Sequence, residues 1–370
     1  MKIKTITCHD VYNVGASLQA YALITYLRSL GHDAEIIDYK PDYLSHHFPI
    51  LGLNNHVFDK PVIREMYNIA KLPGRLKAKY GRRKREFDSF TKKYLPITDI
   101  CYHSNEELKQ KPPEADVYFA GSDQIWNTFF QNGRDPAFYL DFAPADSIRA
   151  SYSASFATEE VPKVWRSRIA DWIKQLDFVS VRESSGVELA KKLGAADAVQ
   201  VLDPVFLLTA KEWTAIESGI SKTKPYVLLY DFDRNTEMVK IARRIADQNG
   251  WKLYSILPCD QCDRCFRQEG PESFVWLVHH AQFVVSNSFH ATAFSLIFQK
   301  QFIVFNRYEG INSRMRDLVR LVGIPDALLQ SGQCAVPPRI DYKKVSPGLT
   351  EEINYAKKYI DRVLSSGVKQ

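Results

Sequence analysis

The segment FVVSNSFHATAFSLIF, residues 283–298, places a histidine where an apolar strand ends and a helix begins. Ser286, Asn287 and Ser288 are residue types that cap helices, so this turn should present free backbone N–H groups and the positive end of a helix dipole. Anionic groups such as phosphate or carboxylate bind at such turns, and in open α/β sheets ligands collect at the carboxyl ends of the strands. His290, in the first turn of the helix, could act on such a ligand. The alternative is a histidine that caps the helix or fills a corner of the core.

Arginines lie beside further predicted strand ends. Arg182 follows a short strand at the start of a helix, Arg307 follows a later strand, and Arg314 begins the next helix. A guanidinium in such a place can make bidentate contacts to a carboxylate or a phosphate across a cleft. The alternative for Arg182 is a surface ion pair with Glu183 or Glu188.

Polar side chains also follow the strand in YFAGSDQIWN, residues 118–127. Gly121 permits close approach of a ligand, and Asp123 and Gln124 are suited to binding hydroxyl groups. Trp126 could offer an apolar face to a sugar ring, or it could belong to the core. The loop before the first helix repeats the pattern with Asn13. Neither GxGxxG nor GxxxxGK[ST] occurs, which argues against the usual NAD and ATP sites.

Three of the six cysteines, Cys259, Cys262 and Cys265, lie in the run CDQCDRC. A structural zinc site needs four ligands, and an iron–sulfur cluster normally needs four cysteines. A fourth ligand would have to come from Cys8, Cys334 or His279. The alternative is a redox-sensitive or merely buried loop. This crowding differs from the dispersed framework of a small secreted protein and favours a reducing compartment.

Short apolar, β-branched runs alternate with amphipathic stretches along the chain, and this rhythm predicts an α/β fold with parallel sheets flanked by helices. The predicted strands are 3–7, 34–38, 117–120, 148–152, 178–181, 199–202, 226–230, 252–256, 283–286 and 302–305. The predicted helices are 17–30, 237–248, 273–281 and 291–299.

At 370 residues the chain exceeds the size at which one hydrophobic core usually stops growing, so we expect two domains. The strand rhythm places a first lobe at 1–205 and a second lobe at 225–340. A linker that includes LDPVFLL should lie between them, within residues 203–224.

Two stretches depart from the rhythm. Residues 40–111 should form an insertion with helices of its own on the surface of the first lobe. Three prolines, the last of them Pro347, should interrupt regular structure before a final helix at 351–364. The segment 341–370 should pack back over the first lobe.

The composition, with 45% hydrophobic and 25% charged residues, is that of a globular protein, and no apolar stretch is long enough to cross a bilayer. The N-terminus lacks the long apolar stretch of a secretory signal, so we expect a cytoplasmic protein. The basic run RLKAKYGRRKREF begins at Arg75 and ends at Phe87. It is typical of a solvated helix face or of a patch that contacts anionic lipid headgroups at the inner face of the membrane. No nucleic-acid motif accompanies it, which argues against a nucleic-acid partner.

Five segments occur in a fixed order along the chain: YNVGASLQAYAL, FAGSDQIWN, SVRESSGVEL, LDPVFLL and VSNSFHATAFSLIFQKQF. Together they resemble the polysaccharide pyruvyl transferase family, from about Cys8 to Gly323. The resemblance implies two Rossmann-like lobes similar to the GT-B glycosyltransferases, with a cleft between their parallel sheets. It also implies phosphoenolpyruvate as donor substrate, no required cofactor, and a saccharide acceptor that receives a pyruvate ketal. The acceptor would be a capsular or exopolysaccharide unit still attached to a membrane lipid.

The resemblance gives the donor-side residues specific roles. His290 matches the family's histidine and would transfer a proton at the enol donor. Arg182 would clamp one anionic group of the donor, and Arg314 or Arg307 the other. Many members carry an arginine two residues before the histidine, where this chain has Ser288. The Ser288 hydroxyl and backbone N–H groups of the turn 286–288 would then contact the donor phosphate.

The acceptor would bind on the first lobe, and the residues expected there are Asn13, Gln19, Asp123, Gln124 and Trp126. Two other functions remain open at this point. One is a GT-B-type glycosyltransferase that uses a nucleotide sugar, although the second lobe lacks an obvious acidic motif for such a substrate. The other is a non-catalytic binding or redox-regulatory protein whose cysteine run holds a metal and whose His290 is structural.

Overall fold

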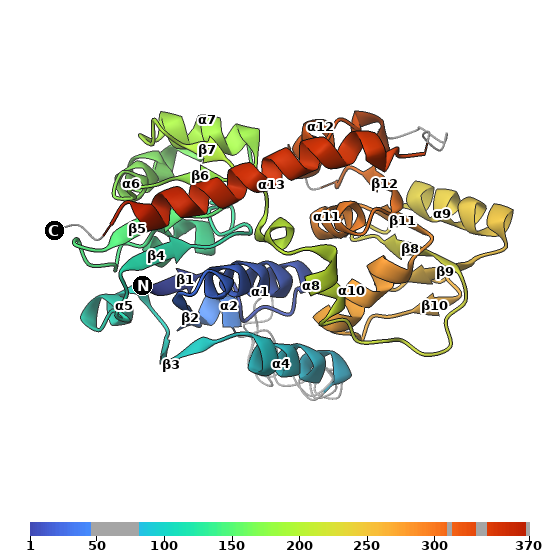
Figure 1. The fold of residues 1–370 in the computed structure, drawn as a ribbon, viewed down its shortest axis with the longest axis horizontal. Helices are drawn as coiled ribbons and strands as arrows, with labels where there is room; N and C mark the ends of the chain where they lie inside the picture. Colours follow the sequence, from blue (N-terminus) through green and yellow to red (C-terminus); the bar gives the residue numbers. More distant parts are fainter. Residues whose placement is uncertain (46–80, 309–312, 331–338, 368–370) are drawn as a thin grey trace, which may run out of the picture.

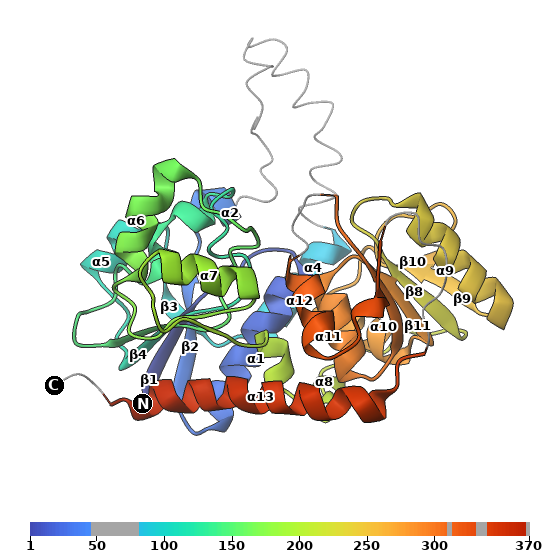
Figure 2. The same cartoon turned by 90° about the horizontal axis from the view of Figure 1, so that it is seen from above.

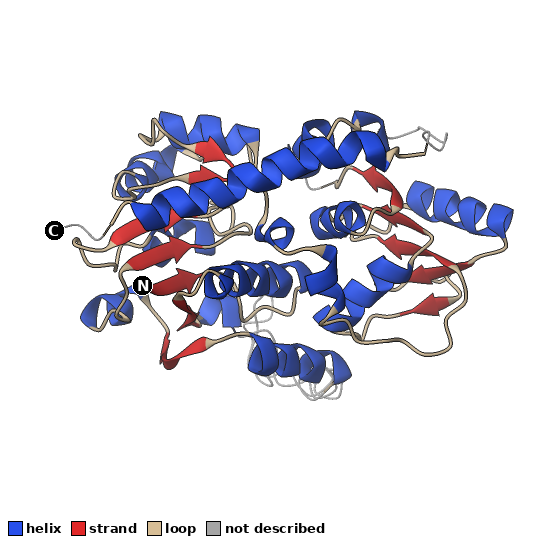
Figure 3. Ribbon diagram, in the orientation of Figure 1, coloured by secondary structure: helices blue, strands red, loops and turns tan. Residues whose placement is uncertain are grey.

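The computed structural model describes residues 1–45, 81–308, 313–330 and 339–367. Its strands form two large parallel sheets and one two-stranded parallel sheet, which lie in two lobes with helices between and around them (Figure 1, Figure 3). The predicted α/β fold class is confirmed. Each predicted strand is present, and its ends differ from the prediction by two residues at most.

The first sheet has the order β3-β2-β1-β4-β5, with every neighbouring pair parallel. Its strands are β1 (Lys2–Ile6), β2 (Asp33–Tyr39), β3 (Ile97–Tyr102), β4 (Val117–Ala120) and β5 (Ile148–Ser151). Two short strands, β6 (Ser180–Val181) and β7 (Val199–Gln200), pair with each other beyond β5. The strand order reverses between β1 and β4, and such a reversal opens a ligand-binding crevice at the carboxyl ends of the strands.

The second sheet has the order β10-β9-β8-β11-β12-β13, also parallel throughout. Its strands are β8 (Tyr226–Tyr230), β9 (Lys252–Ser255), β10 (Arg264–Cys265), β11 (Phe283–Ser286), β12 (Gln301–Phe305) and β13 (Leu328–Leu329). When the strands of each sheet are numbered in chain order, both sheets begin 3-2-1-4-5, which is the strand order of a Rossmann-like fold. The second reversal lies between β8 and β11.

The helices of the first lobe are α1 (Val14–Ser29), α2 (Asp42–Ser45), α4 (Arg82–Tyr94), α5 (Asn105–Gln110), α6 (Lys163–Ile173) and α7 (Ser184–Lys192). After α8 (Ala210–Thr214) come α9 (Thr236–Asn249), α10 (Pro271–His280), α11 (Phe289–Ile297), α12 (Ser313–Leu321) and α13 (Tyr342–Ser365). Side-chain caps start several of them, including the two helices that border the site described below. Asn13 accepts from the N–H groups of Gly15 and Ala16 at α1, and Ser288 accepts from that of Ala291 at α11. No helix among the described residues has both the length and the apolar character that crossing a membrane requires.

The largest apolar core lies between the two sheets and joins both lobes. Successive residues of the buried strands face opposite sides: in β8, Leu228 belongs to this central core, whereas Leu229 belongs to the core beneath α9. The short 3₁₀ turn η4 (Pro204–Leu207) packs against α1 in the central core, where Val205 is fully buried. The LDPVFLL run, which the prediction assigns to a linker, is therefore part of the core.

The prediction for residues 40–111 misses a strand. β3 lies at the edge of the first sheet and pairs with β2 on one side, so three of its six residues are exposed and its sequence ITDICY lacks the apolar pattern of a buried strand. The helices α2, α4 and α5 agree with the expected helical insertion. Residues 46–80 lie outside the described residues.

The prediction that Pro347 interrupts regular structure is wrong. Pro347 lies in the second turn of α13, where the absent N–H removes one helical hydrogen bond and the helix continues for about five more turns. α13 runs along both lobes (Figure 2). Its Tyr342 hydroxyl donates to Ser295 O of α11 at 3.2 Å, and its Tyr359 hydroxyl donates to Ser151 O of β5 at 2.8 Å. The helix is thus fastened to each lobe.

The described part of the basic run begins α4, and its side chains make contacts within the chain. Arg82 Nη2 lies 2.6 Å from Glu269 Oε2, and Arg83 donates to Arg267 O and Tyr12 O. These contacts join α4 to the loop before α10 and to the loop before α1. Membrane contact through this run stays a prediction, and residues 75–80 lie outside the described residues.

Candidate active site

A cavity of about 630 Å³, counting the part open to solvent, lies between the lobes where the two strand-order reversals face each other. From the first lobe it is lined by Asn13, Gly15, Asp123 and Gln124. From the second lobe it is lined by Asn287, Ser288, His290, Arg307 and Arg314. Most of these residues follow β1, β4, β11 and β12 directly, so the two sheets present their carboxyl ends to one space.

His290 is in the first turn of α11, behind the Ser288 cap, and its side chain points at the first lobe. Its ring lies so close to Gly15 that a β carbon on Gly15 would come within 2.0 Å of Nδ1. Its Nε2 lies 3.7 Å from Asp203 Oδ2. Burial lowers the pKa of His290, against the opposite effects of Asp203 and Asp123, so the neutral imidazole is favoured.

Asp203 is a site residue that the sequence analysis missed. It is completely buried and accepts from Val205 N at 3.1 Å and from the Ser122 hydroxyl at 3.2 Å. Its Oδ2 also lies 3.2 Å from Arg182 Nε. The sequence does contain a sign of this role, because Asp203 is the one ionisable residue in the apolar run LDPVFLL. A charged residue in such a run is rarely buried unless it has a partner.

Arg182 lies behind the cavity and does not line it. Its side chain is 2% exposed, lies 3.6 Å from Asp123 Oδ1, and donates to the Ser122 hydroxyl at 2.9 Å. The guanidinium also covers the Phe289 ring at 4.8 Å. The surface ion pair with Glu183 or Glu188 is therefore wrong. Glu183 is itself buried and accepts from the Ser155 hydroxyl and Ala157 N, and burial raises its pKa.

Arg314 is the buried cation that does line the cavity. Its Nη1 lies 3.8 Å from Asp123 Oδ1, and its Nε has no hydrogen-bond partner among the described residues. Burial and the neighbouring Arg182 lower the pKa of Arg314 to about 10, although Asp123 and other carboxylates oppose this. Burial raises the pKa of Asp123, but the guanidinium groups of Arg182 and Arg314 outweigh this effect, and the pKa lies below its ordinary value. The site thus contains a charged guanidinium whose hydrogen bonds are incomplete.

The other predicted donor-side residues divide into two groups. Ser286 and Asn287 are committed to the turn: the Ser286 hydroxyl donates to Tyr230 O, and the Asn287 amide donates to Asp231 and Asp233. The pair of hydrogen bonds from Asn287 ties the loop after β8 to the loop after β11. Arg307 lines the cavity, with Nε 3.0 Å from Asp233 Oδ1. Ser288 also lines it.

The polysaccharide pyruvyl transferase family model matches residues 13–308, most of the chain. The chain belongs to this family. The matched stretch contains Asp123, Arg182, Asp203 and His290, whereas Arg314 lies six residues beyond its end. Among curated proteins, the comparison found no match.

Solved structures with the same fold include UDP-N-acetylglucosamine 2-epimerases. The Rickettsia bellii enzyme has a TM-score of 0.53 at 13% identity, covering 100% of this chain and 97% of that one. The Methanocaldococcus jannaschii enzyme, in complex with UDP-GlcNAc and UDP, has a TM-score of 0.50 at 13% identity, covering 99% of this chain and 100% of that one. At such identities the likeness shows the fold alone, a GT-B-like pair of Rossmann-like lobes.

Within this family member, the residues expected to bind the acceptor are only partly brought together. Asn13, Asp123 and Gln124 line the cavity. Trp126 is completely buried, donates to Phe138 O at 2.9 Å and stacks on Tyr139, so it is a core residue.

Gln19 is also completely buried, and its amide donates to the Thr7 hydroxyl at 2.8 Å. Neither Gln19 nor Trp126 lines the cavity. The prediction that they contact the acceptor is therefore wrong for this structure, because packing turns both side chains inward.

The cysteine run does not assemble a metal site among the described residues. Cys259, Cys262 and Cys265 are free thiols, and burial raises the pKa of Cys262. The described ligand atoms that do come together belong to Glu217, His279 and His280, outside the cavity.

Proposed function

We propose that the chain transfers a pyruvyl group from phosphoenolpyruvate to a saccharide and forms a pyruvate ketal on a capsular or exopolysaccharide repeat unit. The proposal rests on one observation: His290 and Arg314, a neutral acid/base group and an incompletely paired cation, open into the same cavity between the lobes. A donor with a carboxylate and a phosphate supplies an acceptor for the unpaired Nε of Arg314. The family supports a saccharide acceptor.

The donor binds through Arg314 and the amino end of α11, beside Ser288. Arg307, held by Asp233, provides the second positive charge on this side. Arg182 contacts Asp123 and Asp203 and therefore positions these carboxylates instead of clamping the donor. This assignment differs from the role that the resemblance implied for Arg182.

His290 carries the proton. The anionic donor raises the proton affinity of the imidazole, which the free site keeps neutral. The protonated ring then delivers its proton to C3 of the enol, and C2 becomes electrophilic. Two acceptor hydroxyls add to C2 in turn, and the C2–O bond to phosphate breaks. Of the two hydroxyl protons released, one returns to His290 and the other leaves with phosphate, so the reaction balances.

The saccharide enters from the first lobe, where Asn13, Asp123 and Gln124 face the donor across the cavity. We propose that it is still linked to a membrane lipid and that the enzyme acts at the inner face of the membrane. No cofactor is required, because the electrophile comes from the donor itself.

The direct test is phosphate release. The purified chain is incubated with phosphoenolpyruvate and a panel of galactose- and mannose-type saccharides, without added metal. We expect acceptor-dependent release of phosphate and a product that carries pyruvate. Absence of phosphate across the panel, together with UDP release from a nucleotide sugar, would instead support a glycosyltransferase.

A further inference from the structure

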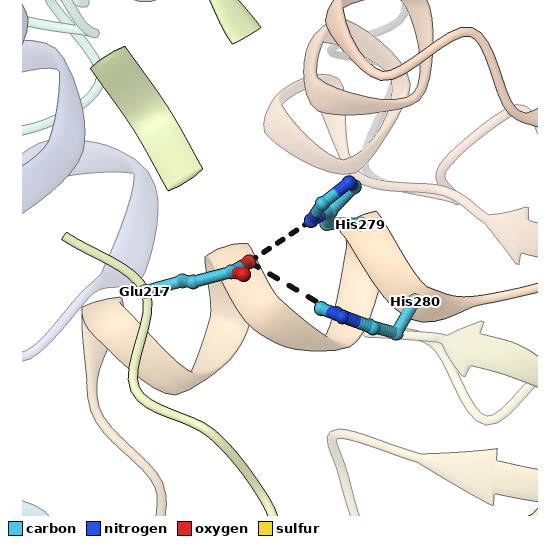
Figure 4. A group of neighbouring side chains, drawn as sticks. All are labelled: Glu217, His279 and His280. Carbon is cyan, nitrogen blue, oxygen red and sulfur yellow. Dashed lines mark hydrogen bonds and ion pairs between the residues drawn. The ribbon is translucent and has the colours of Figure 1, made fainter. Parts of the chain in front are cut away.

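Glu217, His279 and His280 form a compact group outside the cavity (Figure 4). His279 and His280 are the last two residues of α10, and Glu217 lies three residues after α8, in the segment that leads to the second lobe. Glu217 Oε2 lies 3.0 Å from His279 Nδ1 and 3.9 Å from His280 Nδ1. The proposed reaction uses none of the three.

The spacing of these atoms suits a tetrahedral metal ion. One ligand atom from each residue lies within 4.8 Å of the other two. Ligands bound to zinc at about 2.0–2.1 Å in tetrahedral geometry lie about 3.3–3.4 Å apart. The two measured separations from Glu217, 3.0 Å and 3.9 Å, fall on either side of this value.

The rings are held in place by stacking. His279 lies on Phe298 with ring centroids 4.6 Å apart, and His280 lies on Trp276 at 4.2 Å. Both imidazoles remain partly exposed, at 35% and 40% of the side chain, which leaves room for a water ligand. Because the carboxyl end of a helix favours positive charge, the end of α10 suits a cation.

We propose that Glu217, His279 and His280 bind a divalent transition metal, Zn²⁺ by preference, with water in the fourth position. Two imidazoles and one carboxylate form a known zinc ligand set. The ion replaces the hydrogen bond between His280 Nδ1 and Trp276 O, at 3.0 Å.

The metal lies outside the cavity and links two segments of the chain, with water in the position that a closed structural site fills with a fourth protein ligand. The segment after α8 already contacts α10 through Ser218 N, which donates to Glu272 O at 3.2 Å. A bound ion adds a second fastening between the segment and the end of α10. It should raise the thermal stability of the enzyme without entering the reaction, and the proposal therefore stands independently of the proposed function.

The test uses the full chain, freed of metal with a chelator and titrated with Zn²⁺ by calorimetry. We expect one saturable site with micromolar affinity or better, and a rise in the melting temperature that a chelator reverses. Co²⁺ should give the intense visible absorption of a four-coordinate site.

The variants His279→Ala, His280→Ala and Glu217→Gln should each weaken Zn²⁺ binding about tenfold or more. Two matched controls, His103→Ala and Cys262→Ser, should bind as wild type does. Circular dichroism checks that each variant folds. Absence of saturable binding in wild type would overturn the proposal, as would binding that survives in the three ligand variants or is lost in Cys262→Ser.

Discussion

His290 of the second lobe lies against Gly15 of the first, so that a β carbon on Gly15 would stand 2.0 Å from His290 Nδ1. Each residue is in the first turn of its helix, α1 or α11, so the positive ends of two helix dipoles meet at this contact. The contact joins the lobes at the place where an anionic donor is expected. It also leaves no room for any side chain at position 15.

Gly15→Ala should therefore move His290 out of place. Since a displacement of about 1 Å at a reacting group can cost about 10²-fold in rate, we expect phosphate release from phosphoenolpyruvate to fall by that factor or more. Gly348→Ala is the control, because nothing lies within 4 Å of the added carbon and α13 should gain up to about 1 kcal/mol in stability. Wild-type activity in Gly15→Ala would show that the ring can sit elsewhere.

His290→Gln should lower turnover by about 10²–10⁴-fold, the range expected for loss of a general acid/base. The amide keeps much of the shape of the ring but cannot transfer a proton near neutral pH. Phosphate release measures turnover, and circular dichroism checks the fold. A rate close to that of wild type would refute the catalytic role.

Donor binding should draw a proton onto His290, because phosphoenolpyruvate brings negative charge next to a buried, neutral imidazole. Calorimetric titrations in buffers with different ionisation enthalpies measure this uptake. Wild type should take up protons at about pH 7, and His290→Gln should take up fewer. Equal uptake in the two proteins would place the proton on another group.

Arg314→Ala and Arg182→Ala should have different effects. Arg314→Ala removes a buried cation with an unpaired Nε, so it should raise the KM for phosphoenolpyruvate strongly with little loss of stability. Arg182→Ala leaves the carboxylate of Asp203 buried without its partner, and we expect a loss of about 3–5 kcal/mol. Urea denaturation and steady-state kinetics on both variants measure the difference. An unchanged donor KM in Arg314→Ala would contradict the assignment.

Stability should depend on pH through His290. Burial lowers the pKa of this group, so the unfolded chain binds the proton more tightly than the folded chain. The stability contributed by the neutral ring is present above the unfolded-state pKa, about 6.5, and is lost as pH falls through the folded-state pKa. Between about pH 8 and pH 5, the free energy of unfolding should fall more for wild type than for His290→Gln. An equal fall in the free energy of unfolding for the two proteins would mean that folding does not change the pKa of His290.

The sequence by itself determined the features that depend on nearby residues. Strands and helices follow from apolar periodicity over a few positions, and the turn at His290 follows from the capping residues before it. Short-range pattern fails where the environment is unusual. β3 lies at a sheet edge and carries exposed polar residues, and α13 is held by contacts with both lobes and continues through Pro347.

Only the tertiary structure decided which side chains share the site. Asp203 contacts Arg182 and His290, and Gly15 contacts His290. These partners lie 21 to 275 positions apart along the chain, and apolar periodicity does not relate residues at such separations. Burial likewise turned Trp126 and Gln19 into the core and left Arg314 facing the cavity. The physical reason is that burial and ion pairing depend on packing between elements, and a residue's neighbours in sequence do not determine what packs against it.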